Sequence, residues 1–281
     1  MSNPIVPLTL EGASVLHQTF QVRWEEWRAL DPSTRQSIVH EAVEWLEARE
    51  GAEGGEQSAA FAMLGHKGDL LLLHYRKDFV GLLEAQTQVS HLRLSEYMEQ
   101  NSSYLSVVEL GLYESTRKIY DELGERGLAE GTEAWDAAVA ETLERQKKAM
   151  AGRLWPEIPE SRYLCFYPMD RRRGEQKNWY RVGFAERQKM MHEHGLIGRK
   201  YGGVVKQVIS GSIGLDDWEW AVDLFAASPL PFKQLIYEMR FDEVSADYAL
   251  FGQFMIGLRV PSEGLAAFLR GEARAAVGET E

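Results

Sequence analysis

An α+β fold made of two successive βαββαβ units is predicted from the order of strand-like and helix-like patterns along the 281 residues. Two glycine-bounded segments, 65–68 (GHKG) and 211–214 (GSIG), each separate a pair of apolar runs, as hairpin turns do. A strand and then a helix pattern precede each hairpin, and a helix and then a strand pattern follow it. The repeat is one of architecture, because the two units show no convincing sequence identity.

The first unit occupies roughly the first 112 residues. Alternating apolar residues at 15–24 predict a half-buried strand. Asp31 followed by Pro32 predicts a helix start, with an N-cap aspartate and a first-turn proline. Strands at 58–64 and 69–75, a helix at 78–91 and a strand at 103–112 are then expected.

The same order returns after residue 160. Strands are expected at 162–168, 203–210, 217–225 and 251–260, with helices at 183–194 and 231–239, and a short helix after Gly264. The pattern predicts two tandem ferredoxin-like halves of the dimeric α+β barrel type, at 1–113 and 159–281, joined by a charged helical connector at 114–158. The two antiparallel sheets could pack on each other or close into a barrel. Their edges favour self-association.

Composition argues against several classes of protein. A net charge of −12 disfavours a nucleic-acid partner, which would need a basic surface. No apolar run is long enough for a membrane span, and the N-terminus has no secretory signal pattern. A single cysteine, Cys165, cannot form an internal disulfide. These features predict a cytoplasmic protein.

One region is positive within this acidic chain. Residues 161–210 contain eleven Lys/Arg against four Asp/Glu, including the run Arg171, Arg172 and Arg173. Arginine binds carboxylates through two parallel hydrogen bonds, so the region predicts a ligand with several anionic groups.

The same region contains two neighbouring histidines, His192 and His194, in the predicted helix at 183–194. They point roughly 200° apart on a helix, and His194 shares the apolar face. Gly195 is expected to cap the helix, which would place the partial negative charge of the helix end beside His194. No second ligand lies at metal-site spacing, so a structural zinc site is not expected. A single histidine suffices when the metal arrives inside a porphyrin, which supplies four nitrogens.

Several motifs in this region occur together in one known family. They are 162–169 (RYLCFYPM), 178–180 (NWY), 194–199 (HGLIGR), 211–220 (GSIGLDDWEW) and 238–245 (EMRFDEVS). The sequence resembles the coproheme decarboxylases of the chlorite dismutase superfamily, most closely at about 150–258. Two ferredoxin-like halves and a ring-shaped homopentamer are what this resemblance implies for the architecture.

The resemblance also implies roles for individual residues. His194 matches the iron ligand, Tyr167 the catalytic tyrosine that becomes a radical, and Gln207 the glutamine on the other side of the iron. The residues that match positions holding or bordering propionates are Arg153, Met169, Arg171 and Ser245. Many relatives have lysine where this chain has Arg171. A guanidinium keeps the positive charge but cannot readily give up a proton.

The implied activity is the hydrogen-peroxide-dependent conversion of two propionates of iron-coproporphyrin III (coproheme) to vinyl groups. The product would be haem b, formed through a three-propionate intermediate in haem biosynthesis. The porphyrin is then both substrate and redox centre, and a transient contact with the ferrochelatase that delivers it is expected.

Three other interpretations stay open at this point. The first is a chlorite dismutase-like or peroxidase-like haem enzyme; chlorite dismutases have an arginine where this chain has Gln207, so the uncharged side chain argues against dismutation. A haem carrier or sensor would use His194 alone and would need neither Tyr167 nor the arginines. An oligomer that has lost its ligand is the third.

Overall fold

The computed structural model describes residues 4–52 and 56–278. The first unit comprises β1 (Thr9–Val22), α2 (Pro32–Glu50), β2 (Ser58–Leu64), β3 (Leu70–Arg76), α3 (Phe79–His91) and β4 (Met98–Gly111). The second comprises β5 (Tyr163–Arg171), α7 (Phe184–Lys200), β6 (Lys206–Gly211), β7 (Trp220–Ala226), α8 (Leu230–Met239) and β9 (Met255–Val260). The predicted order is therefore confirmed in both units.

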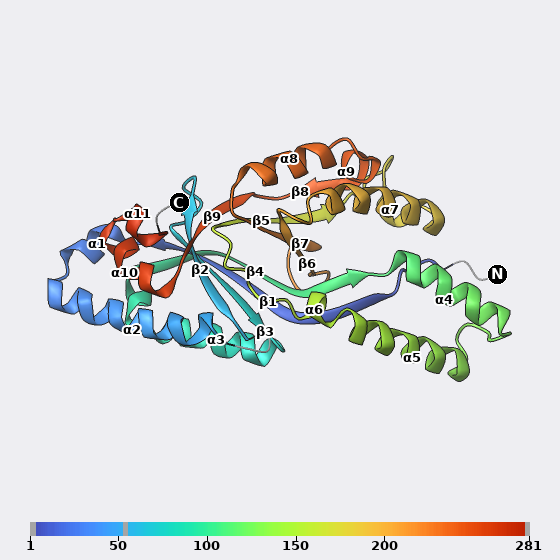
Figure 1. The fold of residues 1–281 in the computed structure, drawn as a ribbon, viewed down its shortest axis with the longest axis horizontal. Helices are drawn as coiled ribbons and strands as arrows, with labels where there is room; N and C mark the ends of the chain where they lie inside the picture. The colour runs from blue at the N-terminus through green and yellow to red at the C-terminus, as the bar shows by residue number, and fades with distance from the viewer. Residues whose placement is uncertain (1–3, 53–55, 279–281) are drawn as a thin grey trace.

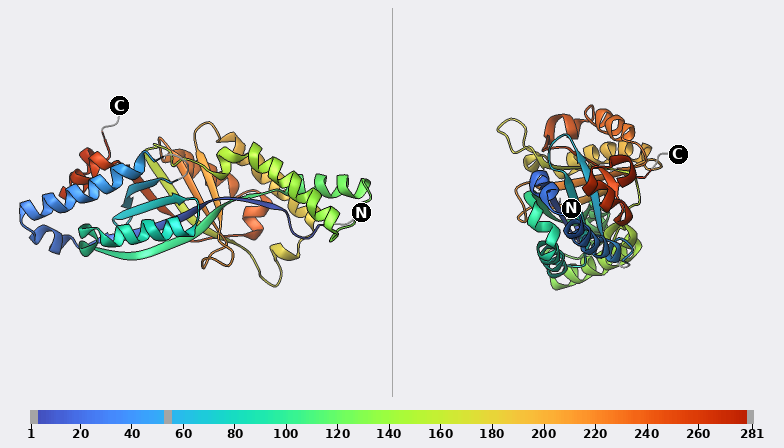
Figure 2. Two further views of the ribbon diagram at one scale, coloured as in Figure 1. Left: turned by 90° about the horizontal axis from the view of Figure 1, so that it is seen from below. Right: turned by 90° about the vertical axis from the view of Figure 1, so that its left-hand side faces the viewer.

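Further elements join and extend these units. They are α1 (Trp24–Ala29), η1 (Arg93–Tyr97), α4 (Tyr113–Glu125), α5 (Glu133–Ala149), α6 (Ala151–Leu154), η2 (Trp179–Arg181), α9 (Glu243–Tyr248), β8 (Ala249–Phe251), α10 (Ser262–Arg270) and α11 (Ala273–Ala276). The connector thus contains two long helices with a turn between them. Figures 1 and 2 show a long molecule, with α2 and α3 toward one end and α4 and α5 toward the other. No helix among the described residues is long and apolar enough to cross a membrane.

The strands form one antiparallel sheet in the order β7-β6-β4-β1-β3-β2-β9-β5-β8. A further pairing of β5 with β7 closes the sheet into a barrel, and β8 extends it beside the end of β5. The two halves join at β4–β6 and at β2–β9, where each covers the open edges of the other. Of the two arrangements left open by the sequence, the closed barrel is correct.

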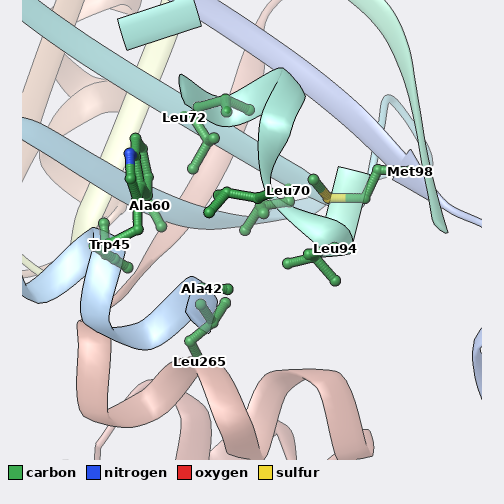
Figure 3. A pocket seen from close by; sticks show the side chains of 11 residues that line it. Ala42, Trp45, Ala60, Leu70, Leu72, Leu94, Met98 and Leu265 are labelled. Carbon is green, nitrogen blue, oxygen red and sulfur yellow. The ribbon is translucent and has the colours of Figure 1, made fainter. Parts of the chain in front are cut away.

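The three largest apolar cores of the described residues lie inside the barrel and on its outer wall. One takes residues from all the barrel strands except β8, including Val15, Phe61 and Phe225, and fills the interior. The other two lie outside the barrel, between its wall and the helices of each half. The outer core of the first half is completed by α10, whose Leu265 and Leu269 pack against α2. A cavity of about 20 Å³ persists there, lined by apolar side chains (Figure 3).

The predicted end of the helix at 183–194 is wrong. α7 continues through Gly195 to Lys200 and is capped by Tyr201. A glycine inside a helix costs about 1 kcal/mol relative to alanine. The apolar residues that follow it offset this cost, because Ile197 and Tyr201 pack into the outer core of the second half. His194 therefore lies inside the helix, and the charge of the helix end does not act on it as expected.

The strand expected at 251–260 is interrupted. β8 ends at Phe251 and β9 begins at Met255. Between them Gly252 packs so closely that a Cβ atom would lie 2.7 Å from Pro168 Cγ and 3.0 Å from Trp218 Cζ2. β8 and β9 pair with the same edge of β5, so residues 252–254 interrupt one continuous edge. The proposed boundaries at residues 113 and 158 stay a prediction.

Candidate functional site

The strand register places the predicted sheet residues on the outer face of the second half. Pairing across β6, β7 and β5 gives three rows: Gln207, Leu224 and Cys165; Ile209, Val222 and Tyr167; Gly211, Trp220 and Met169. Gln207 and Tyr167 lie two strands and one row apart, roughly 12 Å from Cα to Cα at ordinary sheet spacing. The two side chains therefore share one surface without touching each other.

Helix α7 faces this surface with one stripe of residues. Met190 is buried and His194 half-buried, whereas His192 is exposed, as the helix geometry predicts. Further along the stripe, a Cβ atom on Gly198 would lie 3.5 Å from Met239 Cε and 3.9 Å from Gln207 Oε1. Gly198 therefore brings the helix close to β6 where Gln207 lies. His194 and Gln207 come from the two layers that face each other.

His194 is held by a carboxylate that sequence reasoning missed. Its Nδ1 is 2.9 Å from Asp242 Oδ2. Asp242 is also the N-cap of α9, where it accepts hydrogen bonds from the Ser245 N–H (2.8 Å) and Oγ–H (3.2 Å). Burial alone would raise the pKa of Asp242, but the hydrogen bonds from His194 and Ser245 lower it below the usual aspartate value.

This arrangement sets which ring nitrogen of His194 can bind a metal. A carboxylate at Nδ1 favours the tautomer that carries its proton there, so Nε2 keeps a free electron pair. Asp242 lies in the 238–245 motif, and its capping role is readable from sequence. Its contact with His194 is not, because 48 residues separate the two.

Tyr167 is buried, with a side chain enclosed by aromatic rings. Its ring stacks on Phe254 at 4.5 Å and meets Phe251 at 5.8 Å between centroids. Burial raises the pKa of Tyr167 well above its usual value, although Arg240 and Arg171 act in the opposite direction. The phenol therefore keeps its proton at neutral pH. Arg240, over Phe251 at 3.8 Å, is a further cation near the site that the sequence did not indicate.

Arg171 is a cation held in an aromatic cage. Its guanidinium carbon lies 5.1 Å from the Trp179 ring centroid and 6.0 Å from that of Trp220, and Nη2 is 3.7 Å from Met191 Sδ. Burial lowers the pKa of Arg171. Within residues 4–52 and 56–278, no carboxylate forms an ion pair with it. A guanidinium that is withdrawn from water and has no carboxylate partner favours an anionic ligand.

The remaining predicted residues are placed differently. Met169 is in β5 beside Trp220, one row from Tyr167. Ser245 is buried and donates its hydroxyl to Asp242. Arg153 is exposed on α6, and its backbone N–H donates to the Met150 carbonyl. Within the described part of the chain, the Arg153 side chain forms no hydrogen bond or ion pair with β5, β7 or α7. The structure thus gathers His194, Gln207, Tyr167, Met169 and Arg171 around one face, with Ser245 behind His194.

A metal held here would need ligands from outside the protein. The described residues contain no group of three or more His, Cys, Asp or Glu side chains that could hold an ion. A porphyrin iron needs only one protein nitrogen, and a His194 ring protonated at Nδ1 has Nε2 available for such a bond. The residues fit that requirement.

Comparison with known proteins gives the family. A profile described as chlorite dismutase matches residues 35–260. The chain belongs to the chlorite dismutase family. It is 38% identical to the coproheme decarboxylase of Staphylococcus carnosus over 266 residues, which cover 93% of this chain and 97% of that protein.

Other relatives extend the comparison. A protein of Haloquadratum walsbyi named for heme binding is 41% identical over 270 residues, which are 95% of this chain and 48% of that protein. The chain therefore spans about half the length of that relative. A heme-binding protein of Thermus thermophilus superposes with a TM-score of 0.80 at 38% identity, covering 96% of this chain and all of that one. A chlorite dismutase mutant of Candidatus Nitrospira defluvii gives 0.67 at 17% identity, over 92% and 96% of the two chains. This last likeness concerns the fold alone.

Proposed function

We propose that this protein converts coproheme to haem b by oxidative decarboxylation of two propionates with hydrogen peroxide. The observation that carries the proposal is a protonated phenol, Tyr167, on the same sheet face as Gln207 and opposite a histidine whose Nδ1 is engaged by a carboxylate. The match to the Staphylococcus carnosus decarboxylase over nearly the whole of both chains supports it.

His194 would bind the iron through Nε2, with Asp242 at Nδ1. A carboxylate in that position makes the imidazole a stronger electron donor and fixes the ring orientation. When bound, the iron porphyrin supplies the oxidising chemistry together with peroxide. Gln207 is uncharged and would face the other side of the iron, where it can donate or accept a hydrogen bond.

Tyr167 would pass a one-electron oxidation to the propionate. Each step converts a propionate, one hydrogen peroxide and one proton into a vinyl group, carbon dioxide and two waters. Tyr167 loses its hydrogen atom and takes one from the β-carbon of the propionate. The carboxylate would then leave as carbon dioxide, and peroxide would be the final acceptor of both electrons. Arg171 cannot readily supply the proton that is consumed.

The cations would hold the acidic side chains of the substrate. Arg171, fixed between Trp179 and Trp220, offers two N–H groups in one plane to a carboxylate. Arg153, Met169 and Ser245 would contact or border other propionates. Arg153 is exposed and would have to turn toward the substrate.

For assembly and location we propose what the family resemblance and the composition of the chain predict. The protein would form a homopentamer in the cytoplasm and would receive coproheme from a ferrochelatase through a transient contact. Gel filtration with light scattering measures the mass of the assembly and so tests the homopentamer directly.

The activity is tested by product analysis. Protein loaded with iron-coproporphyrin III is titrated with hydrogen peroxide, and the porphyrins are identified by mass spectrometry. We expect a three-propionate intermediate that rises and falls, then haem b, with two carbon dioxide molecules released per porphyrin. Unchanged coproheme at every peroxide ratio would refute the proposal. Oxygen evolution from chlorite instead would indicate a dismutase.

A further inference from the structure

The ring of Tyr167 is supported by two phenylalanines. Phe254 stacks on it at 4.5 Å and an interplanar angle of 26°, and Phe251 meets it at 5.8 Å and 48°. The two phenylalanine rings are also stacked on each other, 6.1 Å apart at 26°. We call Phe251 and Phe254 the aromatic wall.

The wall lies on one side of β5. β8, which ends with Phe251, and β9, which begins just after Phe254, pair with β5 on the edge opposite β7. Val222, Trp220 and Gln207 lie across the other edge, on β7 and β6. Under the proposed function the porphyrin would lie on the Gln207 side of Tyr167. The wall therefore supports the phenol from the opposite side.

The wall is itself fixed at three points. Gly252 donates its N–H to the Pro168 carbonyl (2.8 Å) and leaves no room for a side chain against Pro168 and Trp218. Arg240 covers Phe251. The third contact comes from the other half of the molecule, where Lys67 Nζ, in the turn between β2 and β3, donates to the carbonyl oxygen of Phe254.

We propose that Phe254, anchored by Lys67 of the first half, is a positioning residue for Tyr167. It keeps the phenol turned toward β7 and the substrate and excludes water from the other face of the ring. The first half would thereby contribute to the reaction through one hydrogen bond, from the Lys67 side chain to the Phe254 carbonyl. This inference rests on the proposed function for its chemical meaning, but the support of the ring is a property of the protein alone.

Residue type and placement argue for more than core filling. Several residues of this core are aliphatic, such as Val222, Leu224 and Leu235, and an aliphatic side chain would fill the space at 254 as well. A stacked aromatic ring restricts rotation of the phenol in a way that a branched aliphatic chain does not. A misplacement of about 1 Å at a reacting group can cost about 100-fold in rate.

The first test uses the protein without porphyrin. Tyrosines are replaced by 3-fluorotyrosine, and the fluorine resonance of Tyr167 is assigned by its loss in Tyr167→Phe. Phe254→Leu should move this resonance downfield and sharpen it, because the ring current and the barrier to ring flipping are both lost. Lys67→Met, which keeps the length but removes the donor, should cause a smaller change in the same direction. Matched controls are Phe79→Leu on the exposed start of α3 and Lys77→Met on the surface.

The second test uses coproheme-loaded protein and peroxide. In Phe254→Leu the paramagnetic resonance spectrum of the Tyr167 radical should change its β-methylene hyperfine splitting, which reports the ring angle, and the decarboxylation rate should fall about tenfold. Phe254→Tyr should restore both. An unchanged fluorine resonance in both Phe254→Leu and Lys67→Met would overturn the inference whatever the protein catalyses. A wild-type protein that forms no vinyl product would instead overturn the proposed function and leave the fluorine result standing.

Discussion

The two halves share one topology but use the space between helices and barrel differently. In the first half, α2 and α3 close over Leu72 and Leu94, and α10 adds a third layer with Leu265. The cavity of about 20 Å³ left between them in Figure 3 is too apolar for water. In the second half the same layers carry His194 on the helix and Gln207 and Tyr167 on the sheet.

The difference shows that the fold fixes the position of a site and leaves its chemistry to a few side chains. β2 presents Ala60 and Ala62 to the outer core of the first half. At the matching strand of the second half, β6 presents Gln207 and Ile209, both exposed. The tail helix α10 completes the first core, whereas the second half is extended by the short elements α9 and β8. A closed apolar outer core stabilises the first half, whereas a polar, thinly covered face in the second half can admit a ligand.

Among the variants that test the difference between the two halves, Tyr167→Phe should have the largest effect, a loss of decarboxylation. The variant loses only the hydroxyl that carries the oxidation, so decarboxylation should fall by about 100-fold or more while coproheme affinity changes little. Mass spectrometry of the porphyrins and a Soret titration measure the two quantities. Tyr163→Phe, four residues earlier on the same strand face, is the matched control and should retain activity. Full turnover in the Tyr167 variant would move the radical to another residue.

Leu72→Ala should damage the first half without affecting the site. Leu72 is buried against the cavity, so its truncation enlarges an apolar void and should lower the free energy of unfolding by about 2–5 kcal/mol. Coproheme affinity should stay at the wild-type value. Urea denaturation measures the free energy of unfolding. The control is Leu83→Ala at an exposed position, which should change that free energy by less than about 0.5 kcal/mol. Loss of porphyrin binding in a folded Leu72 variant would show that the halves are not independent.

Asp242→Asn separates the capping role of this residue from its effect on His194. Asparagine caps a helix about as well as aspartate, so α9 should keep its N-terminus. The neutral amide makes His194 a weaker donor, and coproheme affinity or activity should fall about 10–100-fold. Asp78→Asn is the matched control, because Asp78 caps α3 of the first half through Gly81 N–H. The iron–histidine stretching frequency should drop only in the Asp242 variant, and equal effects of both variants would assign Asp242 a purely structural role.

Sequence patterns predicted the element order because hairpin glycines and apolar periodicity act locally. They predicted the faces of His192 and His194 for the same reason. The end of α7 was missed because Gly195 resembles a helix cap. The helix continues because Ile197 and Tyr201, which follow Gly195, pack against residues far away in the chain. The contact of Asp242 with His194 and that of Lys67 with Phe254 join segments far apart in the chain. Neither leaves a local signal, so both required the folded structure.

The smallest expected effect concerns His74, one of two buried histidines of the first half. Its Nδ1 is 2.8 Å from Ser58 Oγ and its Nε2 is 3.2 Å from Gln18 Oε1. Burial lowers the pKa of His74 to about 3, and the nearby cations Arg76 and Arg49 and the ring of His17 act in the same direction. The ring is therefore neutral in the folded protein at all pH values above about 3.

Acid should consequently destabilise the first half through this one residue. Between the unfolded pKa of about 6.5 and the folded value, the unfolded chain binds one more proton, so stability falls as pH falls, by up to about 1.4 kcal/mol per pH unit. Urea denaturation at pH 7 and pH 5 measures this slope. In His74→Gln the contribution should vanish, whereas His40→Gln, at an exposed position of α2, should leave the slope unchanged. An identical slope in wild type and His74→Gln would mean that His74 is protonated in the folded barrel. The burial that keeps this histidine of β3 neutral also removes it from ligand chemistry, whereas His194, half-buried on helix α7 of the other half, stays accessible.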